Sequence, residues 1–360
     1  MPHITGITMT GPAYHHAINV TGEPMQYDRI LLDHGSGGKL AHQLTLDLLL
    51  PLFGNPLLTP LHDGAMFEFN GQRLAFSTDT YTVDPIFFPG GDIGELAVNG
   101  TVNDVAMCGA EPRYLSLALM IEEGFPVDDL KRILASAAQA AKTAGVDIVT
   151  GDTKVVPKGA VDRIFINTSG IGMIPDPVNI GPHRARPGDQ VLMSGTLADH
   201  GVTVMIQREQ LGFDADVQSD TAPLNHMVRE MVATGADIHV LRDPTRGGVG
   251  TALNEIAESS NRGIRIYEDR IPVKPAVGGV CELLGFDPLY LANEGKLLAF
   301  VSPEDAEPVL ESMRRDPSGT DACIIGEVTA DHPGKVVMET RIGGSRFVDM
   351  LTGEQLPRIC

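Results

Sequence analysis

Tryptophan is absent from this chain of 360 residues, and aromatic residues of all kinds make up only 5% of it. Cysteine is also scarce, and its four occurrences are widely separated: Cys108, Cys281, Cys323 and Cys360. No two of them form a C-x-x-C pair. The sequence therefore indicates neither a disulfide framework nor a zinc site, and a reducing cytoplasm fits this cysteine usage.

Basic residues are also few compared with acidic residues. Lys and Arg number 27 against 47 Asp and Glu, which gives a formal charge of −20. Nucleic acid and anionic membranes are therefore not expected as partners over a broad surface. No apolar run is long enough to span a bilayer, and the first residues lack the basic and apolar segments of a secretion signal. We expect neither a membrane span nor export.

The chain is long for a single hydrophobic core, so two domains are expected. A proline-rich segment, Pro175–Pro187, is the best candidate for a linker. Residues 28–174 are then an N-terminal domain and residues 175–350 a C-terminal domain. Residues 1–27 are expected to form a flexible arm, and residues 351–360 have no periodicity and are expected to form a flexible tail.

The first half mixes strands with amphipathic helices. Residues 92–109 and 127–145 predict helices, and Asp92 is the expected N-cap of the first. Strands are predicted at residues 73–80, 146–153 and 163–174, the second of them short, buried and ending in a turn.

The second half shows the same mixture. Its predicted strands are residues 190–195, 264–270 and 296–301, and its predicted helices are residues 222–235, 249–260 and 302–315. Ser302 is the expected cap of the last helix, and residues 335–350 predict a hairpin that turns at Gly343 and Gly344. Both halves together indicate the α+β class.

Two glycine-rich loops suggest anion binding. HGSGGK, His34–Lys39, fits neither a Walker A loop nor a Rossmann fingerprint, because Leu40 stands where each motif needs another residue. It remains a loop that can turn several N–H groups towards a phosphate, and a plain turn is the simpler alternative. DPTRGG, Asp243–Gly248, opens a predicted helix whose free N–H groups favour an anion.

Several aspartates follow apolar strands or lie among small residues, which leaves their carboxylates unobstructed. The five are Asp63, Asp79, Asp104, Asp152 and Asp243. Taken singly, each is explained as a turn or cap residue. Taken together they indicate a metal–phosphate site, because Mg²⁺ prefers oxygen ligands shared with substrate phosphates. Lys154 and Glu294 are isolated charges beside apolar strands, and surface charge is the alternative for both.

The last residue, Cys360, is a thiol at a chain end, where packing is poor. One interpretation is an accident of composition on a disordered tail. The other is a reactive carrier, because a thiolate is a good nucleophile and later a good leaving group.

The order of these motifs resembles the HypE family of hydrogenase maturation proteins. The motifs are HGSGGK, the DG at Asp63, STD, NDVAMCGAEP, GDTKVV, DPTRGG, NEGK and the terminal PRIC. This family belongs to an ATP-binding superfamily that includes aminoimidazole ribonucleotide synthetase, selenophosphate synthetase and thiamine-monophosphate kinase. The resemblance runs from Asp33 to Cys360, and PRIC is its most specific feature.

The resemblance implies a two-domain fold like that of aminoimidazole ribonucleotide synthetase. Its N-terminal half would form a dimeric, β-barrel-like interface near the ATP sites, and its C-terminal half would be α/β with a mobile tail. It implies ATP-dependent dehydration of an S-carbamoyl group on Cys360 to S-cyanide, with Mg²⁺. The implied partners are a second copy, the carbamoyl donor HypF, and a HypC–HypD complex that accepts the cyanide for the [NiFe] centre.

The resemblance also implies roles for individual residues. The metal ligands would be Asp63, Asp79, Asp104, Asp152 and Asp243. The cofactor-binding residues would be Gly35, Ser36, Gly37, Gly38, Lys39, Asn103, Thr153, Arg246, Gly247 and Gly248. The catalytic residues would be Cys360, Lys154 and Glu294, the last two acting on the protons of the carboxamide.

Two other functions remain open at this point. A small-molecule kinase or synthetase of the same superfamily would not need Cys360. A non-enzymatic iron chaperone would use Cys360 as a ligand, although the tail offers no second cysteine or histidine.

Overall fold

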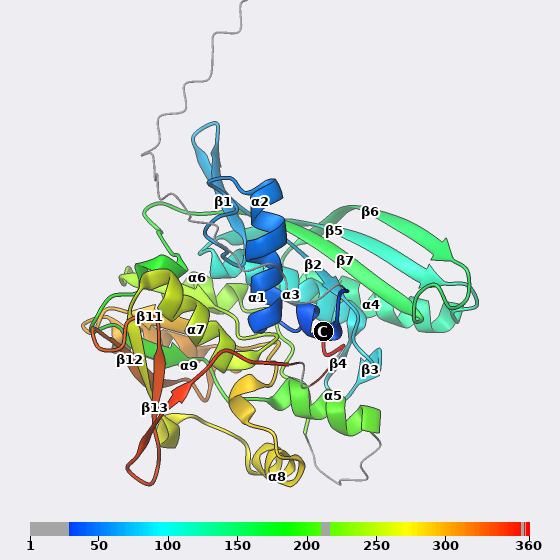
Figure 1. Ribbon diagram of the computed structural model, residues 1–360. Helices are drawn as coiled ribbons and strands as arrows, with labels where there is room; N and C mark the ends of the chain where they lie inside the picture. The colour runs from blue at the N-terminus through cyan, green and yellow to red at the C-terminus, as the bar shows by residue number, and fades with distance from the viewer. Residues whose placement is uncertain (1–28, 210–216, 354–355, 357) are drawn as a thin grey trace, which may run out of the picture.

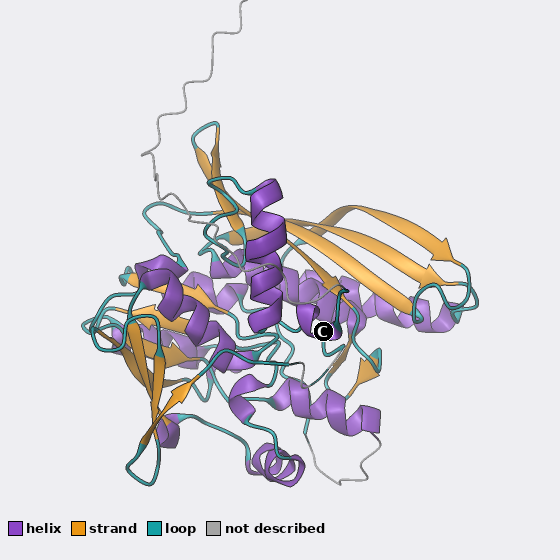
Figure 2. Ribbon diagram, viewed as in Figure 1, coloured by secondary structure: helices purple, strands orange, loops and turns teal. Residues whose placement is uncertain are grey.

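The computed structural model describes residues 29–209, 217–353, 356 and 358–360. The predicted arm at residues 1–27 lies outside the described residues. Two sheets, one from each half of the chain, form the framework (Figures 1 and 2). None of the described helices is long and apolar enough to cross a membrane.

The first sheet has the strand order β1-β2-β7-β5-β6. Its strands are β1 (Ala65–Phe69), β2 (Gln72–Tyr81), β5 (Glu111–Glu122), β6 (Asp147–Val156) and β7 (Ile164–Met173). All neighbours are antiparallel except β5 and β6, which are parallel and joined by α4 (Val127–Ala144). The sheet is open in the single chain, with β1 and β6 as its edges.

Helix α3 (Ile93–Met107) is central to the molecule. Its N-cap is Asp92, whose Oδ1 accepts hydrogen bonds from the N–H groups of Gly94 and Glu95. The helix packs against α4, β2 and β7 and also contacts α6 (Asn225–Ala233) of the second half of the chain, so almost every residue in it is buried. Polar residues on α3 therefore have partners in both halves of the chain.

The second sheet has the order β14-β13-β10-β12-β8-β11-β9. Its strands are β8 (Gln190–Met193), β9 (Ile238–Arg242), β10 (Gly263–Tyr267), β11 (Leu298–Val301), β12 (Cys323–Thr329), β13 (Val336–Glu339) and β14 (Ser345–Val348). One core packs α5 (Asp199–Glu209), α7 (Gly248–Ser260) and α8 (Pro275–Leu284) on the sheet. The other core packs α6 and α9 (Ala306–Arg315) on the sheet. Two helical layers around one sheet agree with the predicted class.

The remaining elements are short. They are η1 (Leu32–Gly35), α1 (Lys39–Leu44), the π-helix η2 (Thr45–Leu49), α2 (Leu50–Phe53), β3 (Phe87–Phe88), β4 (Gly91–Asp92), and the 3₁₀ helices η3 (Pro182–Arg184), η4 (Glu268–Arg270), η5 (Pro288–Tyr290) and η6 (Pro317–Gly319). The first sheet ends at Met173 and the second begins at Gln190, with the proline-rich segment between them.

Three local predictions were wrong. The short buried strand predicted at 146–153 is the ten-residue edge strand β6, and almost all of it is exposed. The last predicted helix begins at Ala306 with Asp305 at the cap position, because residues 303–305 form a turn. Asp79 and Asp152 lie inside strands, not in turns after them. The predicted hairpin is confirmed, with β13 and β14 antiparallel.

Candidate active site

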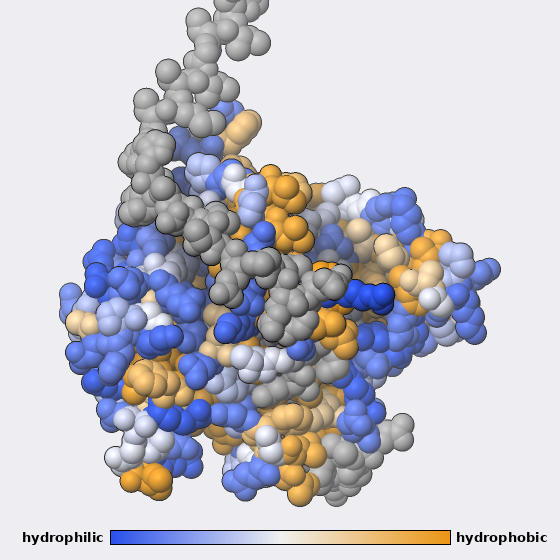
Figure 3. All heavy atoms as spheres, viewed as in Figure 1, coloured by the Kyte–Doolittle hydropathy of each residue, from blue (hydrophilic) through white to orange (hydrophobic). Residues whose placement is uncertain are grey.

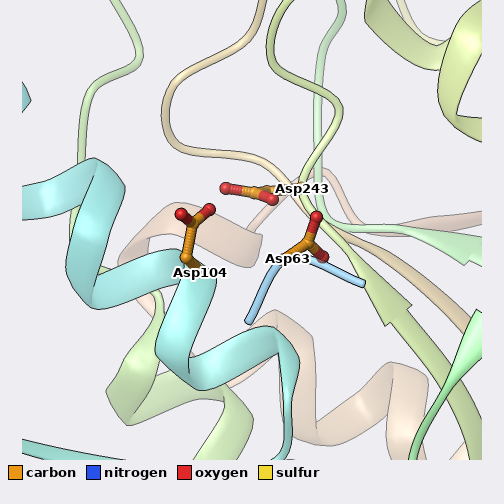
Figure 4. Close-up of side chains that lie close together, drawn as sticks. All are labelled: Asp63, Asp104 and Asp243. Atoms are coloured by element: carbon orange, nitrogen blue, oxygen red, sulfur yellow. The ribbon is translucent and has the colours of Figure 1, made fainter. Parts of the chain in front are cut away.

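Three carboxylates meet between the two halves of the chain. Asp63 precedes β1, Asp104 lies near the end of α3, and Asp243 follows β9 directly. One oxygen from each lies within 4.8 Å of the others, and Figure 4 shows the side chains approaching from three separate segments. Three of the five aspartates singled out in the sequence are therefore neighbours.

The residues around this cluster orient its carboxylates and neutralise their charge only in part. The Ser77 hydroxyl lies 2.7 Å from Asp104 Oδ2 and 2.8 Å from the carbonyl oxygen of Asp63. Arg242 pairs with Asp63 at 2.8 Å, but it also pairs with Glu255 at 2.6 Å. The Oδ2 atoms of Asp63 and Asp243 are buried and accept no hydrogen bond from any described residue.

This crowding changes the proton affinity of the carboxyl groups. Burial, with the charge of Asp63 as the next cause, raises the pKa of Asp243 to about 8. Burial also raises the pKa of Asp104 well above its ordinary value, and Asp243 adds to this effect. Buried like charges are unfavourable unless a cation neutralises them. An all-oxygen donor set with two unpartnered oxygens fits a divalent cation such as Mg²⁺.

The raised pKa of Asp243 predicts how stability depends on pH without a divalent cation. The unfolded chain loses this proton near the ordinary pKa of 3.8, whereas the folded chain keeps it until about pH 8. The unfolded state thus binds fewer protons between these values, and stability should fall as pH rises from about 4 to 8. Thermal denaturation in EDTA across this range measures the effect. Asp243→Asn should flatten the slope, and an equally steep slope in that variant would assign it to other groups.

Asp79 and Arg246 extend the cluster towards the end of the chain. Asp79 lies two residues after Ser77 on β2, so both side chains are on the α3 side of the sheet. Arg246 Nη2 is 3.8 Å from Asp79 Oδ1, and Nη1 donates to the Gly35 carbonyl at 3.2 Å. Arg246 therefore connects the cluster to the first glycine-rich loop.

The two glycine-rich loops pack against each other. Gly37 has a φ of +75°, and a Cβ there would lie 2.8 Å from the Arg246 carbonyl oxygen. A Cβ on Gly248, at φ +63°, would lie 2.5 Å from the Leu289 carbonyl oxygen. Both positions need glycine for their backbone conformation and for close packing. The loops line a cavity of about 220 Å³ to which Gly35, Ser36, Arg246, Gly247 and Cys360 contribute. Lys39 is exposed at the start of α1.

The C-terminal residue Cys360 lies in this cavity and is only 7% exposed. Its N-terminal neighbour Ile359 is 5% exposed and packs in a core cluster with Val204 and Ala292. Burial of such a side chain contributes about 1.5–3 kcal/mol. The predicted tail therefore ends in a docked position, close to where Figure 1 marks the C-terminus beside α3 and β4.

Main-chain hydrogen bonds hold the docked end. The N–H of Thr82 donates to the Cys360 carbonyl at 3.0 Å, and the N–H of Asp84 to the Arg358 carbonyl at 3.1 Å. Residues 358–360 thus lie antiparallel to the segment that continues β2. Burial raises the pKa of the Cys360 thiol, and the Arg246 guanidinium opposes this effect. The docked thiol is accordingly protonated.

Glu294 is 3% exposed and close to the same groups. Burial, then the charges of Asp220 and Asp243, raise the pKa of Glu294 well above its ordinary value. Its Oε1 atom has no hydrogen-bond partner among the described residues. A buried carboxyl group of this kind can accept or return a proton near neutral pH.

Asn103 joins the two halves of the chain. Its Nδ2 donates to the carbonyls of Ala222 at 3.1 Å and Glu294 at 3.4 Å, and its Oδ1 accepts from the N–H of Leu224 at 2.8 Å. These bonds fix the backbone next to Glu294. The side chain is thus engaged by protein groups.

Three other residues singled out in the sequence lie apart from the cluster. Asp152, Thr153 and Lys154 are in the middle of β6, and Lys154 Nζ pairs with Asp152 at 3.1 Å on the surface. Residue Asp152 is in register with Ala118, Asn167 and Thr80 on the three strands up to β2. Three strand spacings amount to about 14 Å. Within one chain, these residues do not reach the other aspartates.

The sequence predictions missed the donors that hold the tail. His200 and Arg208 of α5 donate to the carbonyls of Ile359 and Arg358, at 2.8 and 2.7 Å. No motif distinguishes them, because they bind main-chain atoms whose position follows only from the fold. The one signal in the sequence is that His200 is a polar residue in the first turn of a helix whose start is buried.

Comparison with known proteins places the chain in a family. Residues 61–174 match the N-terminal domain, and residues 186–339 the C-terminal domain, of AIR synthase related proteins. Carbamoyl dehydratase HypE of Bradyrhizobium diazoefficiens is 53% identical over 91% of this chain and 95% of that relative.

Two solved structures are similar over nearly their full length. HypE in complex with ATP has a TM-score of 0.78 and 54% identity, and the match covers 92% of this chain and 100% of that one. The HypE–HypF complex gives a TM-score of 0.82 and 51% identity, with 86% and 99% covered.

Proposed function

The chain belongs to the HypE family of carbamoyl dehydratases, and from this premise we propose that it uses ATP to dehydrate an S-carbamoyl group on Cys360 to S-cyanide for [NiFe] hydrogenase maturation. The observation that carries this proposal is the docking of the terminal thiol in a cavity lined by Arg246, next to the carboxylate cluster. A thiol that served only as a frayed chain end would have no reason to occupy this cavity.

The reaction removes the elements of water from a carboxamide. The carbamoyl oxygen is a poor leaving group until it is phosphorylated by ATP, which becomes ADP. The C–O bond then breaks, phosphate departs, and the nitrogen loses both of its protons as the nitrile forms. Glu294 is the proposed acceptor for one proton, because it is buried near the thiol and its pKa is raised by burial. Arg246 is proposed to stabilise negative charge on the phosphorylated oxygen.

The metal site is proposed on the aspartates of the cluster and Asp79, and the nucleotide site on the two glycine-rich loops, which contribute Gly35, Ser36, Arg246 and Gly247 to the cavity. Asp63, Asp104, Asp243 and Asp79 would hold Mg²⁺, which when bound offsets the charge of the transferring phosphate. The phosphates of ATP would contact the two glycine-rich loops, whose cationic side chains are Lys39 and Arg246. The contacting residues would be Gly35, Ser36, Gly37, Gly38, Lys39, Arg246, Gly247 and Gly248. Asn103 is proposed to act indirectly, by fixing the backbone beside Glu294.

In a homodimer, Asp152, Thr153 and Lys154 of β6 could contribute to the active site of the second copy. The face of the first sheet that points away from α3 carries Phe76, Tyr114, Met120 and Met173, each between 42% and 51% exposed. In Figure 3, apolar side chains lie among polar ones over the strands of this sheet. We propose that a second copy covers this face and that Asp152, Thr153 and Lys154 complete the partner's site. An open sheet with an exposed apolar face supports such pairing.

Mixed dimers test this arrangement. One chain carries Lys154→Ala and the other carries Cys360→Ala. In the mixed dimer, the intact Cys360 of one chain faces the intact Lys154 of the other, so a site shared between copies predicts recovery of dehydration. Each variant alone should be inactive. No recovery in isolated mixed dimers would place Lys154 and Cys360 in the site of the same chain.

The remaining partners follow from the relatives and the chemistry. A HypE has been solved in complex with HypF, and we propose HypF as the carbamoyl donor for this chain. A HypC–HypD complex is proposed as the cyanide acceptor, and the cytoplasm as the compartment, since a carrier thiol must stay reduced.

Nucleotide consumption tests the proposed reaction. Purified protein is mixed with MgATP before and after carbamoylation by HypF, and ADP is measured. The proposal expects about one ADP for each carbamoylated chain and only slow turnover without the adduct. Steady ADP formation at the same rate with and without the carbamoyl adduct would favour a small-molecule kinase of the same superfamily. Iron binding that is unaffected by ATP, without any ADP formation, would favour the iron chaperone.

A further inference from the structure

Three successive carbonyl groups at the end of the chain each accept a hydrogen bond from the body of the protein. Arg208 Nη2 donates to Arg358 at 2.7 Å, His200 Nε2 to Ile359 at 2.8 Å, and the Thr82 N–H to Cys360 at 3.0 Å. All three acceptors are main-chain atoms. The contacts therefore fix the path of the backbone up to the thiol without occupying the thiol itself.

His200 is the most constrained of these donors. Its side chain is fully buried, and the Phe88 ring meets it edge-on with the ring centres 5.3 Å apart. Ser219 Oγ lies 2.8 Å from Nδ1. Because a carbonyl oxygen can only accept, Nε2 carries the proton and Nδ1 accepts from the Ser219 hydroxyl. Burial lowers the pKa of His200, so this neutral form persists at neutral pH.

The same helix also provides an apolar contact for the tail. Val204, one turn after His200 on α5, belongs to the core cluster that receives Ile359. The helix thus holds residue 359 by its carbonyl and by its side chain. The helix itself is anchored elsewhere, because Val202 and Met205 pack in the core of the second sheet.

We propose that His200 is a positioning residue for the dehydration step: its hydrogen bond to the Ile359 carbonyl holds the tail so that the group carried by Cys360 lies in the cavity beside Arg246. Arg208 supports the same path one residue earlier. This inference rests on the proposed function, since it assigns His200 a part in that reaction.

Two neutral substitutions separate positioning from folding. A glutamine amide nitrogen can occupy about the position of the imidazole Nε2, whereas an asparagine amide reaches only the position of Nδ1. His200→Gln can therefore still donate to Ile359, and His200→Asn cannot. Both keep a polar, uncharged side chain in the same pocket, so each is a control for the other.

Three quantities are measured on the full-length protein. They are the alkylation rate of the free Cys360 thiol by iodoacetamide, the single-turnover rate of dehydration after carbamoylation, and the affinity for MgATP. Loss of the hydrogen bond should make alkylation about tenfold faster and dehydration about tenfold slower in His200→Asn. His200→Gln should recover most of both losses. MgATP affinity should be unchanged, because His200 bonds to Ser219 and Ile359 and to neither glycine-rich loop.

The outcomes distinguish this inference from the function on which it rests. If wild-type protein dehydrates its adduct and His200→Asn matches it in alkylation and rate, the positioning role is wrong while the function stands. If wild-type protein forms no cyanide, the function itself fails. Should His200→Asn not fold, His200→Leu replaces the ring with an apolar side chain that cannot donate, and wild-type alkylation and dehydration rates in that variant would equally overturn the proposal.

Discussion

Cys360→Ala is expected to abolish both the carbamoyl and the cyano adduct while leaving MgATP binding intact. The reason is that the thiol and the carboxylates belong to different segments of the chain. The thiol is on the last residue, whereas the carboxylates come from the loop before β1, from α3 and from the residue after β9. Removing one sulfur atom should disturb neither the cluster nor the two glycine-rich loops. Intact mass after incubation with HypF, together with a nucleotide-binding titration, measures both effects.

Cys323→Ala is the matched control, because Cys323 is a partly exposed thiol that does not line the cavity holding Cys360. It should acquire the adduct like the wild-type protein. An adduct on Cys108, Cys281 or Cys323 in the Cys360→Ala variant would contradict the assignment of the carrier.

Asp104→Asn is expected to lower dehydration at saturating ATP by about 100-fold or more. Loss of an outer-shell group at a metal site typically reduces affinity or activity by about 10–100-fold, and loss of a direct ligand should do at least as much. The same change removes one of several crowded buried charges, so the metal-free protein should melt at a higher temperature. A loss of activity together with a gain in stability is expected for a residue that the protein keeps because it binds a ligand.

Single-turnover rates and melting curves in EDTA measure the two effects. Asp269→Asn is a suitable control, because Asp269 is an exposed aspartate of η4 outside the cluster. It should change neither quantity. Wild-type activity in Asp104→Asn and Asp79→Asn alike would remove both residues from the metal site.

Much of this architecture could be predicted from local sequence patterns. Asp92 and Gly145 predict the start of α3 and the end of α4, and Gly343 predicts the turn of the hairpin. These predictions succeed because cap and turn residues act over only a few positions. The chemistry of the aspartates predicts one site made of Asp63, Asp79, Asp104, Asp152 and Asp243, and the fold brings Asp63, Asp104 and Asp243 together.

The failures of prediction have a common cause, which is long-range packing. The exposure of β6 depends on its place at the edge of the sheet, and no local pattern gives that place. The same holds for His200, whose partner is 159 residues away and is a main-chain carbonyl. The resemblance implies that Asn103 binds the cofactor; local sequence gives no sign that its amide also bonds to backbone groups of the second half.

The most direct test of the central claim is the intact mass of carbamoylated protein before and after addition of MgATP, with the modified peptide located by fragmentation. The account predicts that the C-terminal peptide ending in Cys360 loses the mass of one water molecule and that no other peptide changes. An adduct whose mass is unaltered while ATP is consumed, or a loss of water on any other peptide, would contradict it.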